Sequence, residues 1–90
     1  MTDAQILLGI MENDERAWRY IYHNMKIGFA SILQRSFLHV KLVNEDVEDI
    51  FQESLIVLMQ RIKSGGVVIP REGAIFSLLV QIGKLTACNI

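Results

Sequence analysis

The stretch that decides the fold reads NEDVEDIFQESLIVLMQRIK from Asn44 to Lys63. Its apolar residues recur every three or four positions, as they do on the buried face of an amphipathic helix. These apolar residues are Val47, Ile50, Phe51, Leu55, Leu58 and Ile62. The residues left free to point away from this face are Asp46, Asp49, Gln52 and Glu53. The stretch therefore predicts a long helix with one apolar face and one acidic face.

The first turns of this helix are crowded with acidic residues, namely Glu45, Asp46, Glu48 and Asp49. Asn44 is a good N-cap, and the positive end of a helix dipole favours anions, so capping explains part of the pattern. Capping does not explain Glu53, which lies too far along the helix, and no Lys or Arg follows before Arg61 to neutralise the carboxylates. The acidic face therefore indicates a basic partner, and an ordinary solvated helix face is the alternative.

The chain before this stretch predicts two more helices. Thr2 or Asp3 can cap a short first helix that ends at Asn13, and Asp14 opens the next. From Glu15 onward, apolar residues recur with the 3.6-residue period of a helix; they are Trp18, Ile21, Tyr22, Met25, Phe29, Ile32 and Leu33. Basic residues, namely Arg16, Arg19, Lys26 and Arg35, lie mostly on the other side. Gly28 inside this helix indicates a bend or close packing against a neighbour, and residues 36–43 read as a connector.

The chain after Lys63 contains the only strong cluster of structure breakers, Gly65, Gly66 and Pro70. These residues predict a loop over residues 64–73, followed by a last helix that begins in the apolar run from Ala74 to Leu85. We expect an all-α fold, a compact bundle of about four helices in orthogonal and antiparallel packing.

Length and composition limit the possible classes of protein. A chain of 90 residues fits one small domain, residues 1–90. The 9 basic and 10 acidic side chains nearly cancel, so any contact with nucleic acid must be local. With a single cysteine and no secretory signal, we expect a cytoplasmic protein. No apolar run approaches the roughly 20 residues of a membrane span.

Other residue types give no sign of catalysis or of a cofactor. His23 and His39 stand alone, without the partners that a metal site requires. Cys88 reads as a small buried residue, and Tyr20 reads as more exposed than Tyr22 on the apolar stripe. Because the sequence has no glycine-rich phosphate loop and no nucleophile paired with a base, we expect no enzyme, no metal and no cofactor.

Three segments in the same order resemble one protein family. The residues DVEDIFQESL, from Asp46 to Leu55, are similar to the Asp-Ala-Glu-Asp-Leu-Val-Gln-Glu-Thr-Phe signature of extracytoplasmic-function sigma factors. Upstream, DERAW from Asp14 resembles the family's Asp-Glu-Glu-Ala-Phe, and downstream, PREG from Pro70 resembles its Pro-Glu-Arg-Gly. The resemblance covers nearly the whole chain, and three ordered matches are far more specific than one acidic run.

The resemblance implies region 2 of a bacterial sigma factor, the domain that binds core RNA polymerase and takes part in recognising and melting the −10 element of the promoter. It implies that the acidic helix docks on the clamp helices of the polymerase's largest subunit through Asp46, Asp49, Gln52 and Glu53. Because the family's last helix continues beyond the position of Ile90, it also implies an N-terminal fragment of a longer protein. An anti-sigma factor is a further possible partner.

Contact with promoter DNA is implied at the other end of the domain. The residues that the resemblance and their charge or polarity assign to it are Lys63, Arg71, Gln81, Lys84 and Asn89. The last helix nevertheless replaces an arginine, a tryptophan and an asparagine of the family with Gln81, Leu78 and Leu85. Because aromatic stacking and phosphate neutralisation carry most single-strand affinity, we expect weak DNA contact. The alternative is a helical interaction module that keeps the acidic docking face and has lost promoter binding.

Overall fold

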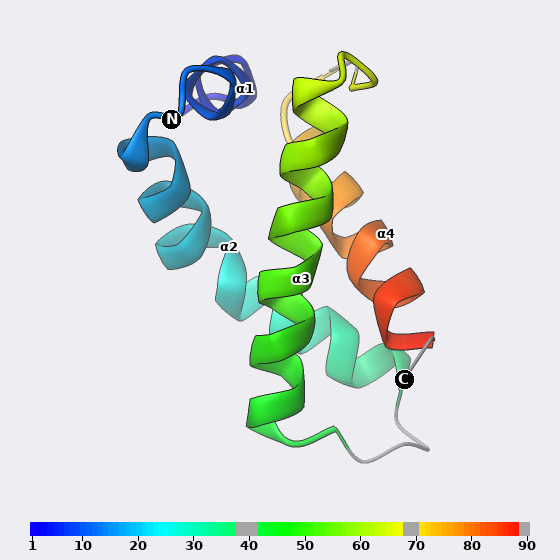
Figure 1. The fold of residues 1–90 in the computed structure, drawn as a ribbon. Helices are drawn as coiled ribbons and strands as arrows, with labels where there is room; N and C mark the ends of the chain where they lie inside the picture. The colour runs from blue at the N-terminus through cyan, green and yellow to red at the C-terminus, as the bar shows by residue number, and fades with distance from the viewer. Residues whose placement is uncertain (38–41, 68–70, 89–90) are drawn as a thin grey trace.

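The computed structural model describes residues 1–37, 42–67 and 71–88, and these residues form four helices. The helices are α1 (Asp3–Met11), α2 (Glu15–Ser36), α3 (Asn44–Lys63) and α4 (Ala74–Cys88), with no strand among the described residues. Figure 1 shows α3 in front of the long α2, with α4 beside it and α1 at one end. The expected all-helical bundle of four elements is confirmed.

The first two helices begin where the sequence predicts. The Thr2 hydroxyl accepts a hydrogen bond from the Gln5 backbone N–H at 3.2 Å, and the Gln5 side chain accepts one from the Thr2 N–H at 2.8 Å. This reciprocal capping box starts α1. The chain then turns at Asn13, whose φ of 57° lies in the left-handed region that asparagine tolerates better than most residues. The Asp14 carboxylate caps α2 by accepting from the Arg16 N–H at 3.0 Å.

The start of α3 differs from the prediction by one residue. Asn44 is already helical, and the N-cap is Val43, whose backbone is extended with φ −83° and ψ 164°. A valine side chain has no acceptor, so it cannot cap a backbone N–H. Instead, the Asp46 carboxylate reaches back and accepts from the Val43 N–H at 3.4 Å. The assignment of Asn44 as the cap was therefore wrong, and Asp46 contributes to the helix start.

The core lies between the inner faces of all four helices. Its fully buried apolar residues include Ile6 and Ile10 of α1, Phe29 and Leu33 of α2, Phe51 and Leu58 of α3, and Ile75 and Leu79 of α4. The residues of the predicted apolar face of α3 are buried, except Leu55, which is half-buried. Ser54, next to Leu55 in the sequence, is fully buried in the core. Because the Ser54 hydroxyl donates to the Ile50 carbonyl at 2.6 Å, its burial leaves no unpaired polar group.

Glycines allow two pairs of helices to approach closely. A Cβ atom at Gly83 of α4 would lie 2.4 Å from the ring of Phe29 on α2, and one at Gly9 of α1 would lie 2.7 Å from the Cβ of Ala17. At Gly28, a Cβ would lie 3.1 Å from Phe76. Of the two interpretations of Gly28, close packing against a neighbouring helix is the one that the structure supports.

The starts of α1 and α4 cap each other. The Asp3 carboxylate accepts from the Ile75 backbone N–H at 3.1 Å, and the Asp3 N–H donates to the Glu72 carboxylate at 2.9 Å. Asp3 is only 4% exposed, yet its charge is placed where the α4 dipole favours an anion. The sequence suggested Asp3 as a local cap of α1, and the structure gives it a distant helix to cap.

Two expectations about exposure were wrong. Cys88, the last residue of α4, is exposed rather than buried. Tyr22 is 37% exposed, whereas Tyr20 is partly buried against the core.

No described helix is long and apolar enough to cross a membrane. Four residues named above, His39, Pro70, Asn89 and Ile90, lie outside the described residues.

Candidate docking surface on the third helix

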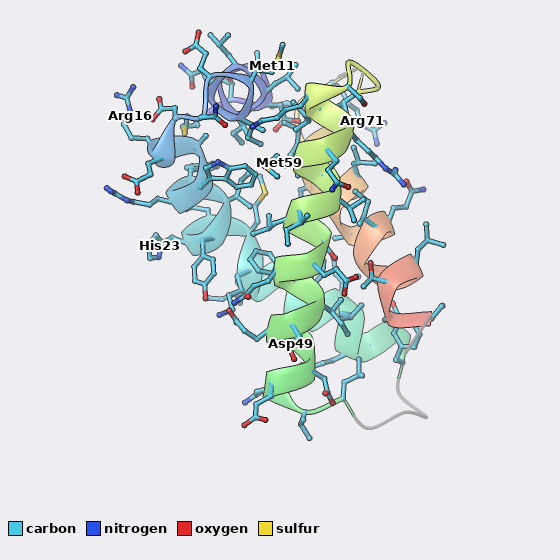
Figure 2. The ribbon with its side chains drawn as sticks, in the orientation of Figure 1. Met11, Arg16, His23, Asp49, Met59 and Arg71 are labelled. Atoms are coloured by element: carbon cyan, nitrogen blue, oxygen red, sulfur yellow. The ribbon has the colours of Figure 1, made fainter. Side chains whose placement is uncertain are left out.

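Three of the predicted polymerase-binding residues share one exposed side of α3. Asp49, Gln52 and Glu53 are spaced by three and four positions, so they lie on one side of the helix, and each is exposed. Figure 2 shows Asp49 on the viewer's side of α3, in the half nearer its start. Neither Asp49 nor Glu53 forms a side-chain hydrogen bond or an ion pair with any described residue. We call these three residues the docking face.

Asp46, the fourth predicted residue, lies at the edge of the docking face. It is half-buried, and its carboxylate is the group that accepts from the Val43 N–H. The Asp46 side chain therefore forms a hydrogen bond at the start of its own helix, whereas the side chains of Asp49 and Glu53 form none with the described residues.

Glu48 belongs to a polar cluster between α2 and α3 that the sequence analysis missed. It forms an ion pair with Lys26 and accepts hydrogen bonds from the Tyr22 hydroxyl at 2.6 Å and from the Gln52 amide at 3.1 Å. Hydrogen bonds from Lys26 and Tyr22 lower the pKa of Glu48 to about 2. The same contacts raise the pKa of Lys26.

The cluster corrects two expectations. The acidic helix has no Lys or Arg of its own before Arg61, and its whole acidic face was expected to need a basic partner, but Lys26 of α2 neutralises Glu48 within the domain. Lys26 was placed on the polar side of α2, away from the core, yet its side chain is only 33% exposed. The sequence hints at this cluster only through the spacing of Tyr22 and Lys26, which are one helical turn apart. In the structure the Lys26 ammonium lies 4.6 Å from the centre of the Tyr22 ring.

An apolar hollow adjoins the docking face. It is lined by Trp18 of α2 and by Gln52, Leu55, Ile56 and Met59 of α3, and its volume is about 300 Å³. Ile56 is 52% exposed at its edge. Figure 2 shows Met59 between α2 and α3, further along α3 than Asp49. Because Gln52 borders both, the acidic residues and the hollow form one continuous surface.

The predicted DNA-binding residues are more scattered. Gln81 and Lys84 are exposed on neighbouring turns of α4 and line a second hollow together with Ile32, Phe76 and Val80. Arg71 is exposed before the start of α4, and 13 positions separate it from Lys84 in the sequence, so the two cations lie towards opposite ends of the helix. Lys63 donates a hydrogen bond to the Asn13 side chain at 2.6 Å, which ties it to the turn between α1 and α2.

The described residues contain no group of three or more His, Cys, Asp or Glu side chains placed to hold a metal ion. His23 is exposed on α2, where Figure 2 shows it pointing away from α3.

Comparison with known proteins adds no relative. The chain matches no model of a known protein family, no curated protein and no solved structure. The resemblance to sigma factors therefore rests on the three sequence motifs alone.

Proposed function

We propose that this chain is a sigma factor domain that docks on the clamp helices of bacterial RNA polymerase through α3. The observation that carries the proposal is the pairing of Asp49 and Glu53, which have no described cation partner, with an apolar hollow that Gln52 joins to them. A basic helical partner would give the two carboxylates charge-assisted hydrogen bonds, which are stronger than bonds between neutral groups.

The hollow supports the proposal because an acidic face alone gives orientation and fast association more than affinity. Stable interfaces gain most of their affinity from a few well-packed residues at their centre, often aromatic, surrounded by polar ones. Trp18, Ile56 and Met59 offer such a centre next to the carboxylates. An apolar side chain of the partner would fill the hollow while its basic residues meet Asp49 and Glu53.

We assign a part in promoter recognition and melting to the surface around α4. Gln81 and Lys84 lie together there, and Arg71 precedes the helix, where it can meet a phosphate. The resemblance also assigns a DNA contact to Asn89, which lies outside the described residues, and charge assigns one to Lys63 at the end of α3. Lys63 would have to leave Asn13 in order to bind DNA.

A second candidate function is a protein-interaction module without promoter binding. It is favoured by the engagement of Lys63 with Asn13 and by the sequence of α4, in which Lys84 is the only basic residue. Such a module would keep the docking face and bind a polymerase subunit or a regulator through it.

Binding of the purified chain to a clamp-helix fragment of the polymerase tests the docking proposal. We expect Glu53→Lys to weaken the complex by roughly 10-fold or more, because it sets like charges against each other. Glu12→Lys is the matched control, since it makes the same charge change at an exposed position in the turn between α1 and α2. An equal loss in both variants, or no binding of the unaltered chain, would refute docking through α3.

The two candidate functions separate in a second titration. A labelled single-stranded promoter oligonucleotide is added to the chain assembled with core polymerase, and the salt concentration is varied. The sigma proposal expects sequence-dependent binding that weakens steeply with salt and is reduced by Lys84→Ala. Binding of the polymerase fragment without any sequence-dependent binding of DNA would favour the interaction module instead.

A further inference from the structure

Gln52, the central residue of the docking face, is hydrogen-bonded to Glu48 of the polar cluster between α2 and α3. Its amide nitrogen donates to one carboxylate oxygen of Glu48 at 3.1 Å, and the other oxygen of Glu48 is paired with Lys26. Gln52 itself is exposed, while the Glu48 side chain is only 27% exposed. An exposed glutamine is thus tied to a partly buried ion pair.

The chemistry of this contact decides which end of the Gln52 amide faces outward. An ionised carboxylate only accepts hydrogen bonds, so the amino group of Gln52 must be the end that turns towards Glu48. The carbonyl oxygen of the same amide is then free to point towards a partner. This orientation follows from the identity of Glu48 as an acceptor and from its ion pair with Lys26.

The base of the cluster is fixed by the core. The Tyr22 hydroxyl donates to the Glu48 oxygen that Gln52 also contacts, and it accepts from the Lys26 ammonium at 3.1 Å. The Tyr22 ring packs edge-on against the buried ring of Phe51, with 5.8 Å between the ring centres. Glu48 therefore has little freedom to follow Gln52 if that side chain turns away.

We infer that Glu48, fixed by Lys26 and Tyr22, is a positioning residue that holds Gln52 with its carbonyl oxygen outward, so that each residue of the docking face presents an acceptor oxygen. This inference rests on the proposed docking function and adds the chemistry that the face selects. Asp49 and Glu53 offer carboxylate oxygens on either side, and the charge of Glu48 is neutralised within the domain by Lys26. A guanidinium group, which has only donors, fits such a surface better than a group that must also accept.

The position of Gln52 is tested without any partner, by nitrogen-15 NMR of its side-chain amide. In the unaltered chain the two amide protons should differ in shift and exchange slowly, because one of them is hydrogen-bonded. Glu48→Ala should move both signals towards those of an ordinary exposed glutamine such as Gln60, whereas Glu53→Ala, at an adjacent exposed position, should leave them in place. Unchanged Gln52 signals in Glu48→Ala would overturn the inference.

Affinity for the clamp-helix fragment then separates positioning from direct contact. We expect Gln52→Ala to weaken binding by about 10-fold, as for a lost hydrogen bond to a charged group. Glu48→Ala should cost a similar factor, and the double variant should lose no more than about twofold beyond either single change. Additive losses, near 100-fold together, would mean that Glu48 contacts the partner itself and would overturn the positioning role.

The conservative variant Glu48→Gln tests whether Glu48 acts by holding Gln52 or through its own charge. It keeps an acceptor oxygen within reach of Gln52 and removes the charge, so we expect its affinity to stay within about threefold of the unaltered chain. An affinity as low as that of Glu48→Ala would show that the charge of Glu48 acts directly, contrary to the inference. Circular dichroism checks that each variant is folded. Absence of binding by the unaltered chain would refute the docking function, while the NMR result would still decide the position of Gln52.

Discussion

Gly83→Ala is the substitution for which the structure predicts the clearest packing defect. The added Cβ would lie 2.4 Å from both Cε2 and Cζ of Phe29, where carbon atoms ordinarily stay about 3.5–4.0 Å apart. Phe29 is only 1% exposed, and its ring packs edge-on against Phe51 with 5.0 Å between the ring centres. The ring has no open space beside it, so the added methyl group must either push the ring against Phe51 or move α4 away from α2 by about 1 Å.

The expected magnitude is the difference between two opposing effects. Overpacking a dense core typically costs about 1–3 kcal/mol. Replacing glycine by alanine inside a helix returns up to about 1 kcal/mol through the better helix propensity of alanine. Because the approach at Gly83 is so close, we expect a net loss of about 1–2 kcal/mol in the free energy of unfolding.

Gly28→Ala is the matched control, because it has the same gain in propensity at another contact between α2 and α4. Its Cβ would lie 3.1 Å from the tip of the Phe76 ring, which is half-buried and able to turn outward. We expect its free energy of unfolding to be unchanged or raised by up to about 1 kcal/mol. Urea unfolding followed by the fluorescence of Trp18, the single tryptophan, measures both variants. A Gly83→Ala variant as stable as Gly28→Ala would refute the close approach of α2 and α4.

Three further predictions concern other contacts. Asp3→Ala should lower the free energy of unfolding by about 0.5–2 kcal/mol and speed the hydrogen exchange of the Ile75 amide, whereas Thr2→Ala should leave that amide protected; equal exchange in both would contradict the mutual cap. Since the pKa of Glu48 is lowered from 4.5 to about 2 on folding, its ion pair stabilises the fold above about pH 4.5, and this stabilisation is lost as the pH falls towards 2. The unaltered chain should therefore exceed Glu48→Gln in stability at pH 7, and the difference should shrink across that range in urea unfolding at each pH; a constant difference would contradict it. Cys88 is exposed, so its thiol should react with a thiol reagent in the folded chain about as fast as in urea, and strong protection would contradict its exposure.

Much of this fold follows from local patterns in the sequence. The apolar period fixes the phase of α2 and α3, and the polar residues Thr2 and Asp14 mark where α1 and α2 begin. The shift from Asn44 to Val43 at the start of α3 is within the one or two residues by which helix ends are uncertain, and Asp46 accepts from the Val43 N–H from inside the helix. The mutual cap of Asp3 and the start of α4 was beyond prediction, because it joins residues that are distant in sequence and close only once the bundle has formed.

In the candidate site, too, the sequence predicted the local features but not the contacts between helices. The helical phase of α3 was enough to predict that Asp49, Gln52 and Glu53 are exposed together. It gave no means of predicting the pair of Lys26 and Glu48, because that contact depends on how α2 and α3 are rotated relative to each other. The exposure of Tyr22 was misjudged for a related reason. Its ring follows the apolar stripe, but its hydroxyl needs a polar partner, and the hydrogen bond to Glu48 draws it to the surface.

A chain of aromatic contacts connects the tight crossing at Gly83 with the docking face. Phe29, against which Gly83 packs, contacts Phe51, and Phe51 contacts Tyr22, whose hydroxyl binds Glu48. If the added methyl group of Gly83→Ala displaces the Phe29 ring, the rings of Phe51 and Tyr22 must adjust, because a dense core transmits such strain.

We therefore expect the side-chain amide signals of Gln52 to shift in folded Gly83→Ala and to stay in place in Gly28→Ala, in nitrogen-15 NMR spectra recorded without denaturant. Gly28 contacts Phe76, which belongs to neither the aromatic chain nor the polar cluster. Unchanged Gln52 signals in a destabilised Gly83→Ala variant would mean that α4 moves as a body and that the α2–α3 pair, with the docking face on it, keeps its geometry without support from α4.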